Sequence, residues 1–561
     1  MQSQYDVIIL GGGLAGLTLS IQLKRMNPEI SILVLERRDS GAATAAHKVG
    51  ESTVELGSHY LREVLGLKEY LEEFELPKHG LRFFFPTANK DDIANRVELG
   101  PRELLPTPSH QLDRGTLENF LAVRTQELGT EVILGATVKD VNIDAAGGHT
   151  VTFIKDGASI TKQSKWAADA TGRGSFMKRK LDFHKPMEHH VNAVWWRLKG
   201  VIDVDDWSDN KEWKTYLKPG LRYLSTVHFM DKGYWLWVIP LGSKNTSIGI
   251  VADPAVHPFD TFNKYDKAME WLKVNEPRGY KMLEPQTPNL LDFKILKHYA
   301  HHTGRVYCAS ERWGVTGEAG AFLDPLYSPG TDFIAMNNSW LSDLIVRDLK
   351  GEDVEGRAQV FEQSHLRLVD NWIPVYQDKY LLMGNTQIMV MKIFWDWATY
   401  WSVPTLLFTN QAFTNMAMLK ELFSSARGLG RKFGELNKVM QDLFLEWAPF
   451  ENASFEDRYI DPYDLEYMRD FQKDIDTKYE PDALIEKIRA NMKILEQVAS
   501  DIFRLVSAQV NGTPLNMKVD PYKIKLKGSG MPVEIEVEEN IDPSIKKDVD
   551  LMWFYPKPEF A

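Results

Sequence analysis

The chain has 561 residues, of which 43% are hydrophobic and 26% are charged. A length of this order predicts about three folding units, and the ordinary composition excludes a disordered, collagenous or coiled-coil protein. The 66 basic and 78 acidic side chains give a net charge of −12 and a pI near 5.7. This acidic balance argues against a nucleic-acid backbone as the main ligand.

A single cysteine, Cys308, excludes an internal disulfide framework and a cysteine-based zinc site, and predicts a reduced, cytoplasmic protein. Two uncharged stretches, 7–23 and 397–419, approach the length of a membrane span. Four glycines lie within the first stretch, and a proline and several polar residues interrupt the second, so we predict no membrane span. The histidine pairs 189–190 and 301–302 lack the spaced partners of a metal site, and we expect no metal.

The amino-terminal segment carries a dinucleotide-binding pattern. The apolar run 6–10 predicts a buried parallel strand, and residues 17–26 have helical spacing. Between them lies a G-x-G-x-x-G motif. Its first glycine makes a tight turn, the second lets the backbone approach a pyrophosphate, and the third lets helix and strand pack closely. The residues expected to meet the cofactor here are Gly11, Gly13, Leu14, Ala15 and Gly16.

An acidic residue follows at the distance that this pattern requires. The predicted strand 31–35 ends at Glu36, which lies 20 residues beyond Gly16 and next to Arg37. A carboxylate there can accept a hydrogen bond from an adenosine ribose and would repel a ribose 2′-phosphate. The segment therefore predicts FAD or NAD rather than NADP. The alternative is a glycine turn in some other βα unit.

Three later segments resemble the flavin-contacting motifs of the aromatic-hydroxylase-like FAD enzymes. They are Asp113-Arg114 before the helical stretch 115–128, the run A-D-A-T-G-R-G at 168–174, and G-E-A at 317–319 ahead of Asp324-Pro325. Each alone could be a surface turn. Together they imply FAD contacts by Arg114, Asp169, Thr171, Gly172, Gly317, Glu318, Asp324 and Pro325.

The remaining sequence predicts two further parts. Segments 80–105 and 185–300 alternate and are rich in aromatic residues, which predicts a second sheet inserted between the nucleotide-binding pieces. We divide the chain into a module over 1–345 and a mainly helical domain over 346–561 that covers the substrate site. Lysines and glutamates that alternate with apolar residues over 523–538 predict a terminal β-hairpin. The expected class is α/β (α+β), a Rossmann-type FAD-binding domain interleaved with a mixed-sheet substrate domain.

The stretch 388–413 crowds seven aromatic residues together, and its role stays open. One interpretation is aromatic core between helices. The second is a wall over an apolar substrate channel or a lipid-facing patch. The apolar stripe over 484–502 has helical spacing and predicts core packing.

Three more motifs are not typical of flavin enzymes in general. They are W-x-W-x-I-P at 235–240, K-V-G-E-S-T at 48–53 and P-K-H-G-L-R-F at 77–83. Alone, the first reads as a strand with two core tryptophans on one face. Together with the flavin motifs, they resemble the flavin-dependent halogenases over residues 1–345.

This resemblance implies catalytic roles for Glu51, Lys78, Trp235, Trp237 and Tyr327, and FAD contacts by Gly50, Ser52 and Thr53. The apolar neighbours of Lys78 point the same way, because desolvation disfavours an ammonium and leaves the amine usable as a nucleophile or hydrogen-bond donor. The alternative is a surface lysine. Backbone N–H groups at a helix start could bind halide, and the residues expected there are Ser328, Gly330 and Thr331.

In the implied reaction, reduced FAD, O2 and chloride or bromide give hypohalous acid, which Lys78 passes to the substrate while the two tryptophans keep substrate from the flavin. No second strand-flanked G-x-G-x-x-G is present, so reduced FAD would come from a separate flavin reductase. Tyr327 stands where tryptophan halogenases carry glutamate, which favours the chloramphenicol-pathway and phenol or carrier-protein halogenases. We expect an electron-rich phenol or pyrrole, or alternatively an acyl group on a carrier protein. The sequence also leaves open an aromatic hydroxylase on the same fold or a flavin protein that has lost catalysis.

Overall fold

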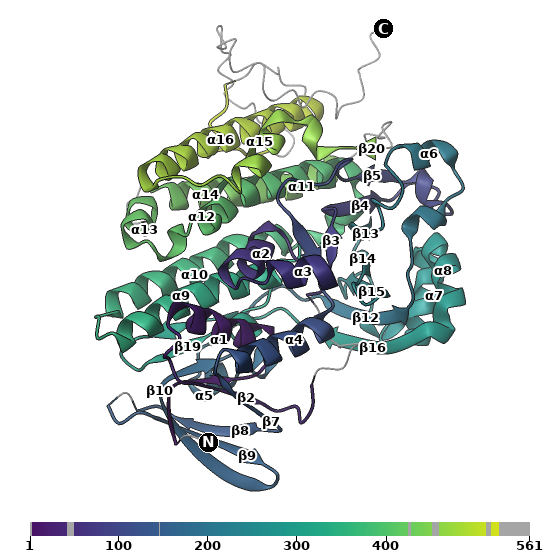
Figure 1. Cartoon of the computed structure of the whole chain (residues 1–561). Helices are drawn as coiled ribbons and strands as arrows, with labels where there is room; N and C mark the ends of the chain where they lie inside the picture. Colours follow the sequence, from purple (N-terminus) through teal and green to yellow (C-terminus); the bar gives the residue numbers. More distant parts are fainter. Residues whose placement is uncertain are drawn as a thin grey trace, which may run out of the picture.

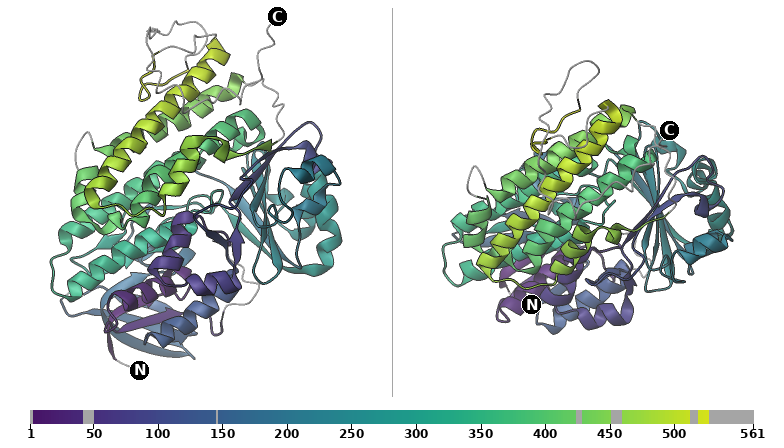
Figure 2. Two further views of the ribbon diagram at one scale, coloured as in Figure 1. Left: turned by 45° about the horizontal axis from the view of Figure 1, so that its top comes forward. Right: turned by 90° about the horizontal axis from the view of Figure 1, so that it is seen from above.

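The computed structural model describes residues 3–41, 50–144, 146–423, 428–450, 459–511 and 518–526. Figure 1 shows an α/β layer at the bottom, a second sheet on the right and a thick layer of helices at the top and left. The views in Figure 2 agree that the C-terminal helices form one layer beside the second sheet. The predicted mixed α/β class is confirmed.

The first sheet is built around a buried parallel strand, β1 (Gln4–Leu10). Ile9 lies opposite Val34 on one side and Ala168 on the other, so both neighbouring strands run parallel to β1. The strand order is β18 (Tyr307–Cys308), β19 (Trp313–Val315), β10 (Ala158–Asp169), β1, β2 (Ile32–Glu36) and β7 (Glu131–Leu134), with β8 (Thr137–Asn142) and β9 (His149–Lys155) attached to β10.

The chain leaves β1 toward β2 and returns on the other side as β10. This reversal opens a crevice at the carboxyl ends of the strands, the usual ligand position in such sheets. One face of the sheet is covered by α1 (Leu14–Met26), which packs against α4 (Arg114–Glu127) and α9 (Gly330–Leu349).

The second sheet buries both of its faces, and side-chain alternation divides them. Leu236 and Val238 pack in a core with α7 (Tyr265–Asn275) and α8 (Pro277–Leu283), whereas the tryptophans of the same strand join the main core. The strand order is β16 (Leu290–Lys297), β12 (Asn192–Lys199), β15 (Asn245–Ala252), β14 (Tyr234–Pro240), β13 (Thr226–Asp231), β4 (Leu81–Phe85), β5 (Val97–Leu99) and β20 (Tyr459–Ile460).

Short elements join the two sheets next to the crevice. The strand β3 (Leu76–Lys78) pairs with β6 (Ser109–Gln111), and the isolated bridge from Ser52 to Gln111 fixes the nearby loop. The remaining short elements are α2 (Glu55–His59), α3 (Lys68–Phe74), α5 (Phe176–Lys180), β11 (His184–Lys185), α6 (Lys211–Thr215) and β17 (His302–Thr303).

The helical layer consists of α10 (Glu355–Tyr376), α11 (Thr386–Tyr400), α12 (Leu406–Thr409), α13 (Met416–Phe423), α14 (Leu429–Trp447), α15 (Glu466–Asp474) and α16 (Pro481–Asn511). The apolar stripe over 484–502 of α16 is buried, as predicted. The strand β20 returns to the second sheet beside β5. The division at residue 345 stays a prediction, and the expected hairpin lies outside the described residues except for 523–526.

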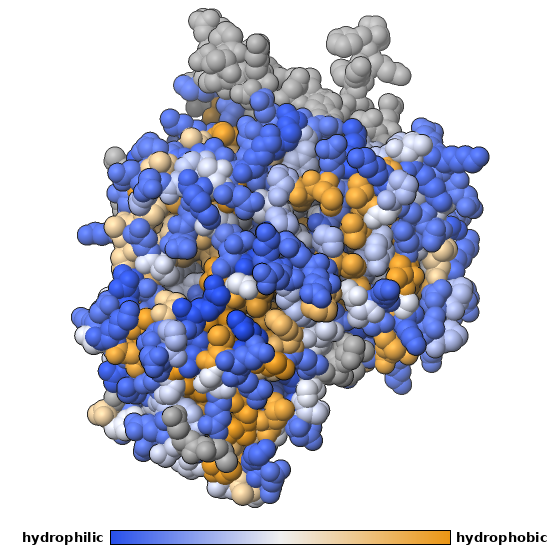
Figure 3. All heavy atoms as spheres, viewed as in Figure 1, coloured by the Kyte–Doolittle hydropathy of each residue, from blue (hydrophilic) through white to orange (hydrophobic). Residues whose placement is uncertain are grey.

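The surface in Figure 3 is mainly hydrophilic, with apolar patches between the polar residues. Within the described ranges, none of the helices combines the length and the apolar character needed to cross a bilayer.

Candidate active site

Two cavities meet at the start of α9. The nucleotide cleft, of about 850 Å³, lies at the carboxyl ends of β1 and β10 and is bordered by the second sheet. The aromatic cavity, of about 670 Å³, lies between β3, α9, α10, α11 and α14. Pro329, in the turn that begins α9, lines both cavities.

The glycine turn after β1 leaves bare backbone at the nucleotide cleft. Gly11 has a φ of +108°, and a Cβ there would lie 2.3 Å from the Ala170 carbonyl oxygen. A Cβ on Gly16 would lie 2.0 Å from the Gly11 carbonyl oxygen, so Gly16 serves helix packing and does not line the cleft. The residues of the turn that line the cleft are Gly11, Gly13, Leu14 and Ala15.

Glu36 closes one end of the cleft. Its carboxylate accepts hydrogen bonds from the Gly12 N–H at 2.7 Å and from Arg38 Nε at 3.0 Å. The exposed Arg37 lines the same end. This arrangement holds an acidic group where an adenosine ribose would lie in a bound dinucleotide.

Arg114 extends from the start of α4 into the cleft. Its guanidinium donates to the Gly50 carbonyl oxygen at 3.4 Å and to Glu118 at 2.8 Å. The cleft is lined by Gly50 and Arg114, while Lys48 and Val49 of the same early motif lie outside the described residues.

Asp169 shapes the cleft from behind. It accepts hydrogen bonds from the Thr171 N–H at 2.9 Å, the Thr171 hydroxyl at 2.6 Å and the Met177 N–H at 2.7 Å. Thr171 and Gly172 line the cleft, whereas Asp169 does not. The aspartate therefore fixes the loop that would meet a ligand.

The third expected flavin segment also borders the cleft. Gly317 has a φ of +61°, and a Cβ there would lie 2.9 Å from the Ala15 Cβ, so a side chain would collide with the glycine turn. The cleft is also lined by Glu318, Asp324 and Pro325.

Asp324 is the centre of a buried hydrogen-bond network. Its Oδ2 lies 2.8 Å from His189 Nε2, and it accepts from the hydroxyls of Tyr299 at 3.0 Å and Tyr380 at 2.7 Å. The Trp235 indole in turn donates to the Tyr380 hydroxyl at 3.0 Å. Tyr380 belongs to the segment Tyr380–Gly384 of the helical layer, so this network joins that layer to the cleft.

Trp235 and Trp237 lie on one face of β14, as predicted from their spacing, and both line the nucleotide cleft. Their ring centroids are 5.5 Å apart. Gly249 on β15 faces the second ring, and a Cβ there would lie 2.1 Å from it. Trp195 lines the same wall, and its buried indole N–H has no hydrogen-bond partner within the described part of the chain. That unpaired donor fits a cleft that holds a polar ligand.

Glu51 also lines the nucleotide cleft, but it is paired. Arg197 Nε donates to Glu51 at 2.8 Å, and Arg197 Nη1 donates to Asp292 at 2.8 Å. All three side chains are buried. Burial raises the pKa of Glu51, and the neighbouring guanidinium offsets part of that effect.

Lys78 ends the strand β3 and lines the aromatic cavity. Its Nζ donates to Ser52 Oγ at 2.9 Å and to the Thr53 carbonyl oxygen at 2.7 Å. Ser52 lines the nucleotide cleft, whereas Thr53 lines neither cavity. Burial lowers the pKa of Lys78 to about 7, although the Glu55 and Asp332 carboxylates oppose the shift. The amine therefore lies at the boundary between the two cavities and is partly neutral near pH 7.

The expected halide loop forms that boundary. Ser328 has a φ of +57°, a left-handed conformation that turns the chain into α9. The nucleotide cleft is lined by Ser328, Gly330 and Thr331, while the next residue, Asp332, lines the aromatic cavity. The first N–H groups of a helix have no intrahelical acceptor, so α9 offers donors at this point.

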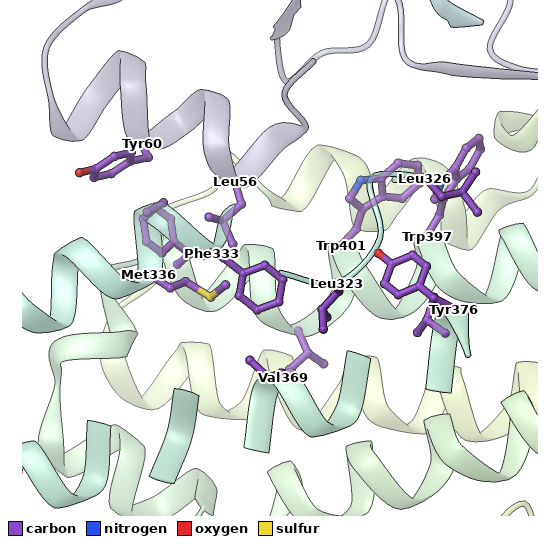
Figure 4. Packing of buried hydrophobic residues seen from close by; sticks show 14 of the residues in the cluster. Leu56, Tyr60, Leu323, Leu326, Phe333, Met336, Val369, Tyr376, Trp397 and Trp401 are labelled. Atoms are coloured by element: carbon purple, nitrogen blue, oxygen red, sulfur yellow. The ribbon is translucent and has the colours of Figure 1, made fainter. Parts of the chain in front are cut away.

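Aromatic rings form much of the wall of the second cavity. Figure 4 shows Trp397, Trp401 and Tyr376 around the loop that carries Leu323 and Leu326. The rings of Trp397 and Trp401 are 5.8 Å apart, and Trp401 stacks on Tyr463 at 5.9 Å. Further rings of the stretch 388–413, such as Trp395, are core. The two interpretations of that stretch therefore apply to different residues.

Tyr327 lines the aromatic cavity and belongs to a second buried network. Its hydroxyl donates to Asp396 Oδ2 at 2.7 Å, and Lys392 forms an ion pair with the same carboxylate. Gln441 donates to Asp396 Oδ1 at 2.7 Å. Burial, together with the Asp396 charge, raises the pKa of Tyr327 well above its ordinary value, so it stays a neutral phenol.

Comparison with known proteins connects these features. The profile of the FAD binding domain family matches residues 4–250. Flavin-dependent halogenase chlA of Dictyostelium discoideum is 28% identical over 72% of this chain and 70% of its own length. A 1H-pyrrole-2-carbonyl-(peptidyl-carrier protein) chlorinase of Pseudomonas fluorescens is 23% identical over 66% of this chain and 82% of its own. The chain is similar in sequence to the flavin-dependent halogenases.

The fold agrees with that family. The structure of halogenase PltM in complex with phloroglucinol and FAD matches with a TM-score of 0.61 at 16% identity, and the match covers 93% of this chain and 98% of that chain. Among the described residues of this chain, no group of three His, Cys, Asp or Glu side chains could hold a metal ion.

Sequence reasoning missed several polar residues of the aromatic cavity. Glu55, Asp332 and Asp396 line it and are buried, and Lys392 lies behind Asp396. Only Asp332 had a signal, because it directly follows the expected halide loop. The others come from helices whose packing in this protein the sequence did not predict.

Proposed function

We propose that this protein is a flavin-dependent halogenase that holds FAD in the nucleotide cleft and its organic substrate in the aromatic cavity, with Lys78 passing the halogen between them. One observation carries the proposal. Lys78 lines the aromatic cavity, while its Nζ is hydrogen-bonded to Ser52, which lines the nucleotide cleft. A buried amine at this boundary can reach both reactants.

Bare glycine backbone, Glu36 and Arg114 would hold the FAD, and the unpaired Trp195 N–H supplies a further donor. Reduced FAD with O2 would supply the oxidation of chloride or bromide to hypohalous acid. The halide would bind at the start of α9, where the backbone donors of Gly330 and Thr331 face the cleft beside Ser328. Because the sequence carries no NADPH-binding motif, a separate flavin reductase would supply the reduced FAD.

The protein's contribution is positioning and exclusion of water. Trp235 and Trp237 line the nucleotide cleft and would keep the organic ring away from the FAD. Lys78 would hold hypohalous acid by a hydrogen bond or as a haloamine. Its lowered pKa suits both roles, since the neutral amine is the nucleophile and the ammonium is the donor.

The substrate we favour is a free electron-rich aromatic compound, a phenol or a pyrrole. The stack of Trp401 on Tyr463, with the tilted ring of Trp397 beside it, suits a planar ring. One matched structure holds phloroglucinol, a phenol. The alternative is an acyl group on a carrier protein, as the names of two matched relatives, a chlorinase and a brominase of carrier-bound pyrrole, specify.

The test is halogenation by photoreduced, FAD-loaded protein mixed with oxygenated buffer that contains bromide or chloride and an electron-rich phenol. Mass spectrometry reads the product. We expect halogenated phenol from wild type, none from Lys78→Met, and wild-type yield from Lys379→Met, a buried lysine outside both cavities. Hydroxylated phenol without halide, or equal halogenation by Lys78→Met, would overturn the proposal. Reaction of only a carrier-bound substrate would select the alternative.

A further inference from the structure

The wall of the aromatic cavity includes a carboxyl group that the proposed function does not use. Glu55 lies in the first turn of α2, is 4% exposed and lines the cavity together with Lys78. Burial is the largest influence on its pKa and raises it, while the charge of Lys78 lowers it. A buried acid that faces a cavity and a catalytic amine calls for a functional explanation.

Close helix packing creates this arrangement. A Cβ on Gly57 of α2 would lie 2.8 Å from Asp332 Oδ1 and 2.9 Å from the Thr331 Cβ, so only glycine lets α2 and α9 approach this closely. The contact brings Glu55 from one helix and Asp332 from the other to the surroundings of Lys78, where both charges raise the pKa of the amine.

The carboxyl groups of Asp332 and Glu55 have different hydrogen-bond partners. Asp332 accepts from the Gly57 N–H at 2.8 Å through Oδ1 and from the Tyr400 hydroxyl at 2.8 Å through Oδ2. It is thereby fixed to the protein. Glu55 interacts with its own backbone N–H and with the Trp401 and Gln472 side chains. A carboxylate has about four acceptor positions, so these partners leave one for a ligand in the cavity that Glu55 lines.

A second polar group in the cavity is unpaired. The Tyr463 hydroxyl is buried and has no hydrogen-bond partner among the described residues, although its ring stacks on Trp401 at 5.9 Å. Tyr463 lines the cavity, and the charge of Glu55 is the largest that acts on it. An unpaired buried hydroxyl beside a carboxylate and an aromatic stack matches a ligand with both an aromatic ring and a hydroxyl group.

We propose that the substrate is a phenol whose hydroxyl binds Glu55, and that Glu55 accepts the phenolic proton during halogenation. This inference rests on the proposed function. It selects a phenol over a pyrrole, and it gives the reaction a proton acceptor besides the amine that delivers the halogen.

Atoms and electrons balance in this step. The ring carbon forms a bond to the halogen of hypohalous acid held by Lys78, and the halogen–oxygen bond breaks with its electron pair on oxygen. That oxygen takes a proton from the Lys78 ammonium and leaves as water, while the phenolic O–H proton moves to Glu55 to give a neutral dienone. The ring C–H proton then passes to the Lys78 amine, and Glu55 returns its proton to oxygen. The net change is phenol and hypohalous acid to halophenol and water.

The experiment compares resorcinol with its dimethyl ether, 1,3-dimethoxybenzene, in wild type and Glu55→Gln. The ether keeps an electron-rich ring but has no proton to give. We expect Glu55→Gln to lower kcat/KM for resorcinol by about 10²-fold or more, the usual effect of losing a general base, and to change the ether reaction little. Glu75→Gln, a buried glutamate outside both cavities, should keep the wild-type ratio between the substrates.

Equal losses with both substrates, or no loss with resorcinol, would overturn the assignment of Glu55. Retained reaction with the ether and normal FAD binding establish that the variant is folded. A binding measurement separates this proposal from the proposed function. Wild type should bind resorcinol more tightly than 1,3-dimethoxybenzene, and Glu55→Gln should lose that preference. If wild type shows this binding preference and Glu55→Gln loses it, but no halogenation occurs, the proposed function is wrong and the role of Glu55 in binding stands. If halogenation occurs but wild type shows no such preference, the role of Glu55 is wrong and the proposed function stands.

Discussion

The titration of Lys78 tests the electrostatics on which the proposed chemistry depends. Its pKa of about 7, against 10.5 for an ordinary lysine, follows mainly from burial. The difference corresponds to about 5 kcal/mol of disfavoured charging. At pH 7 about half of the amine would be neutral, whereas roughly one ordinary lysine in 3,000 is neutral at that pH.

The cause of the lowered pKa determines in which direction pH changes the reactivity of Lys78. Because burial disfavours the ammonium, the amine gains its proton only when the pH falls through about 7, and its nucleophilic reactivity is lost on that acidic side. We expect the rate of acetylation of Lys78 by acetic anhydride to be half-maximal near pH 7. Mass spectrometry of the modified peptide measures that rate, without any contribution from FAD.

Lys379 provides the control, since it is also buried but lies outside both cavities, and its pKa is lowered to about 8. Exposed lysines report the intrinsic reagent rate at each pH. In Glu55→Gln the midpoint of Lys78 should move lower still, because the carboxylate raises its pKa. A midpoint for Lys78 near 10.5 would refute the reasoning, and so would an upward movement in the variant.

Three further substitutions have defined outcomes. Gly11→Ala should abolish FAD binding, measured by flavin absorbance after gel filtration, because the φ of +108° and a contact of 2.3 Å leave no room for a Cβ; bound FAD at wild-type stoichiometry would contradict this. Gly249→Ala should displace Trp237, whose ring lies 2.1 Å from the new Cβ, and weaken FAD binding in an equilibrium titration, while an unchanged affinity would place that ring away from the FAD. Asp396→Asn leaves Lys392 buried without its partner and should lower stability by about 3–5 kcal/mol, seen as a lower Tm, whereas an unchanged Tm would mean that the pair contributes nothing.

Much of the nucleotide cleft could be predicted from local sequence. The glycine turn and its acidic partner Glu36 are separated by one βα unit, so their spacing along the chain fixes their positions in space. The alternation of a strand likewise places Trp235 and Trp237 on one face. In the same way, the apolar neighbours of Lys78 indicated that it is buried.

The local sequence pattern predicted less about the roles of side chains whose partners lie far away along the chain. Asp169 matches the expected flavin motif, but it supports the loop from behind. Glu51 was expected to act in catalysis, and the structure pairs it with Arg197, which is 146 residues away. Whether such a residue faces a ligand or a neighbour depends on packing between distant segments.

The sequence by itself determined the nucleotide-binding turn, the class of fold and the family resemblance, because short-range geometry and strand or helix periodicity set those features. Only the tertiary structure decided the chemistry of the aromatic cavity. Glu55, Lys78 and Asp332 come from α2, β3 and α9, and they meet because Gly57 lets two helices touch. Desolvation and the interaction of charges depend on distance in space, and no spacing along the chain specifies that distance.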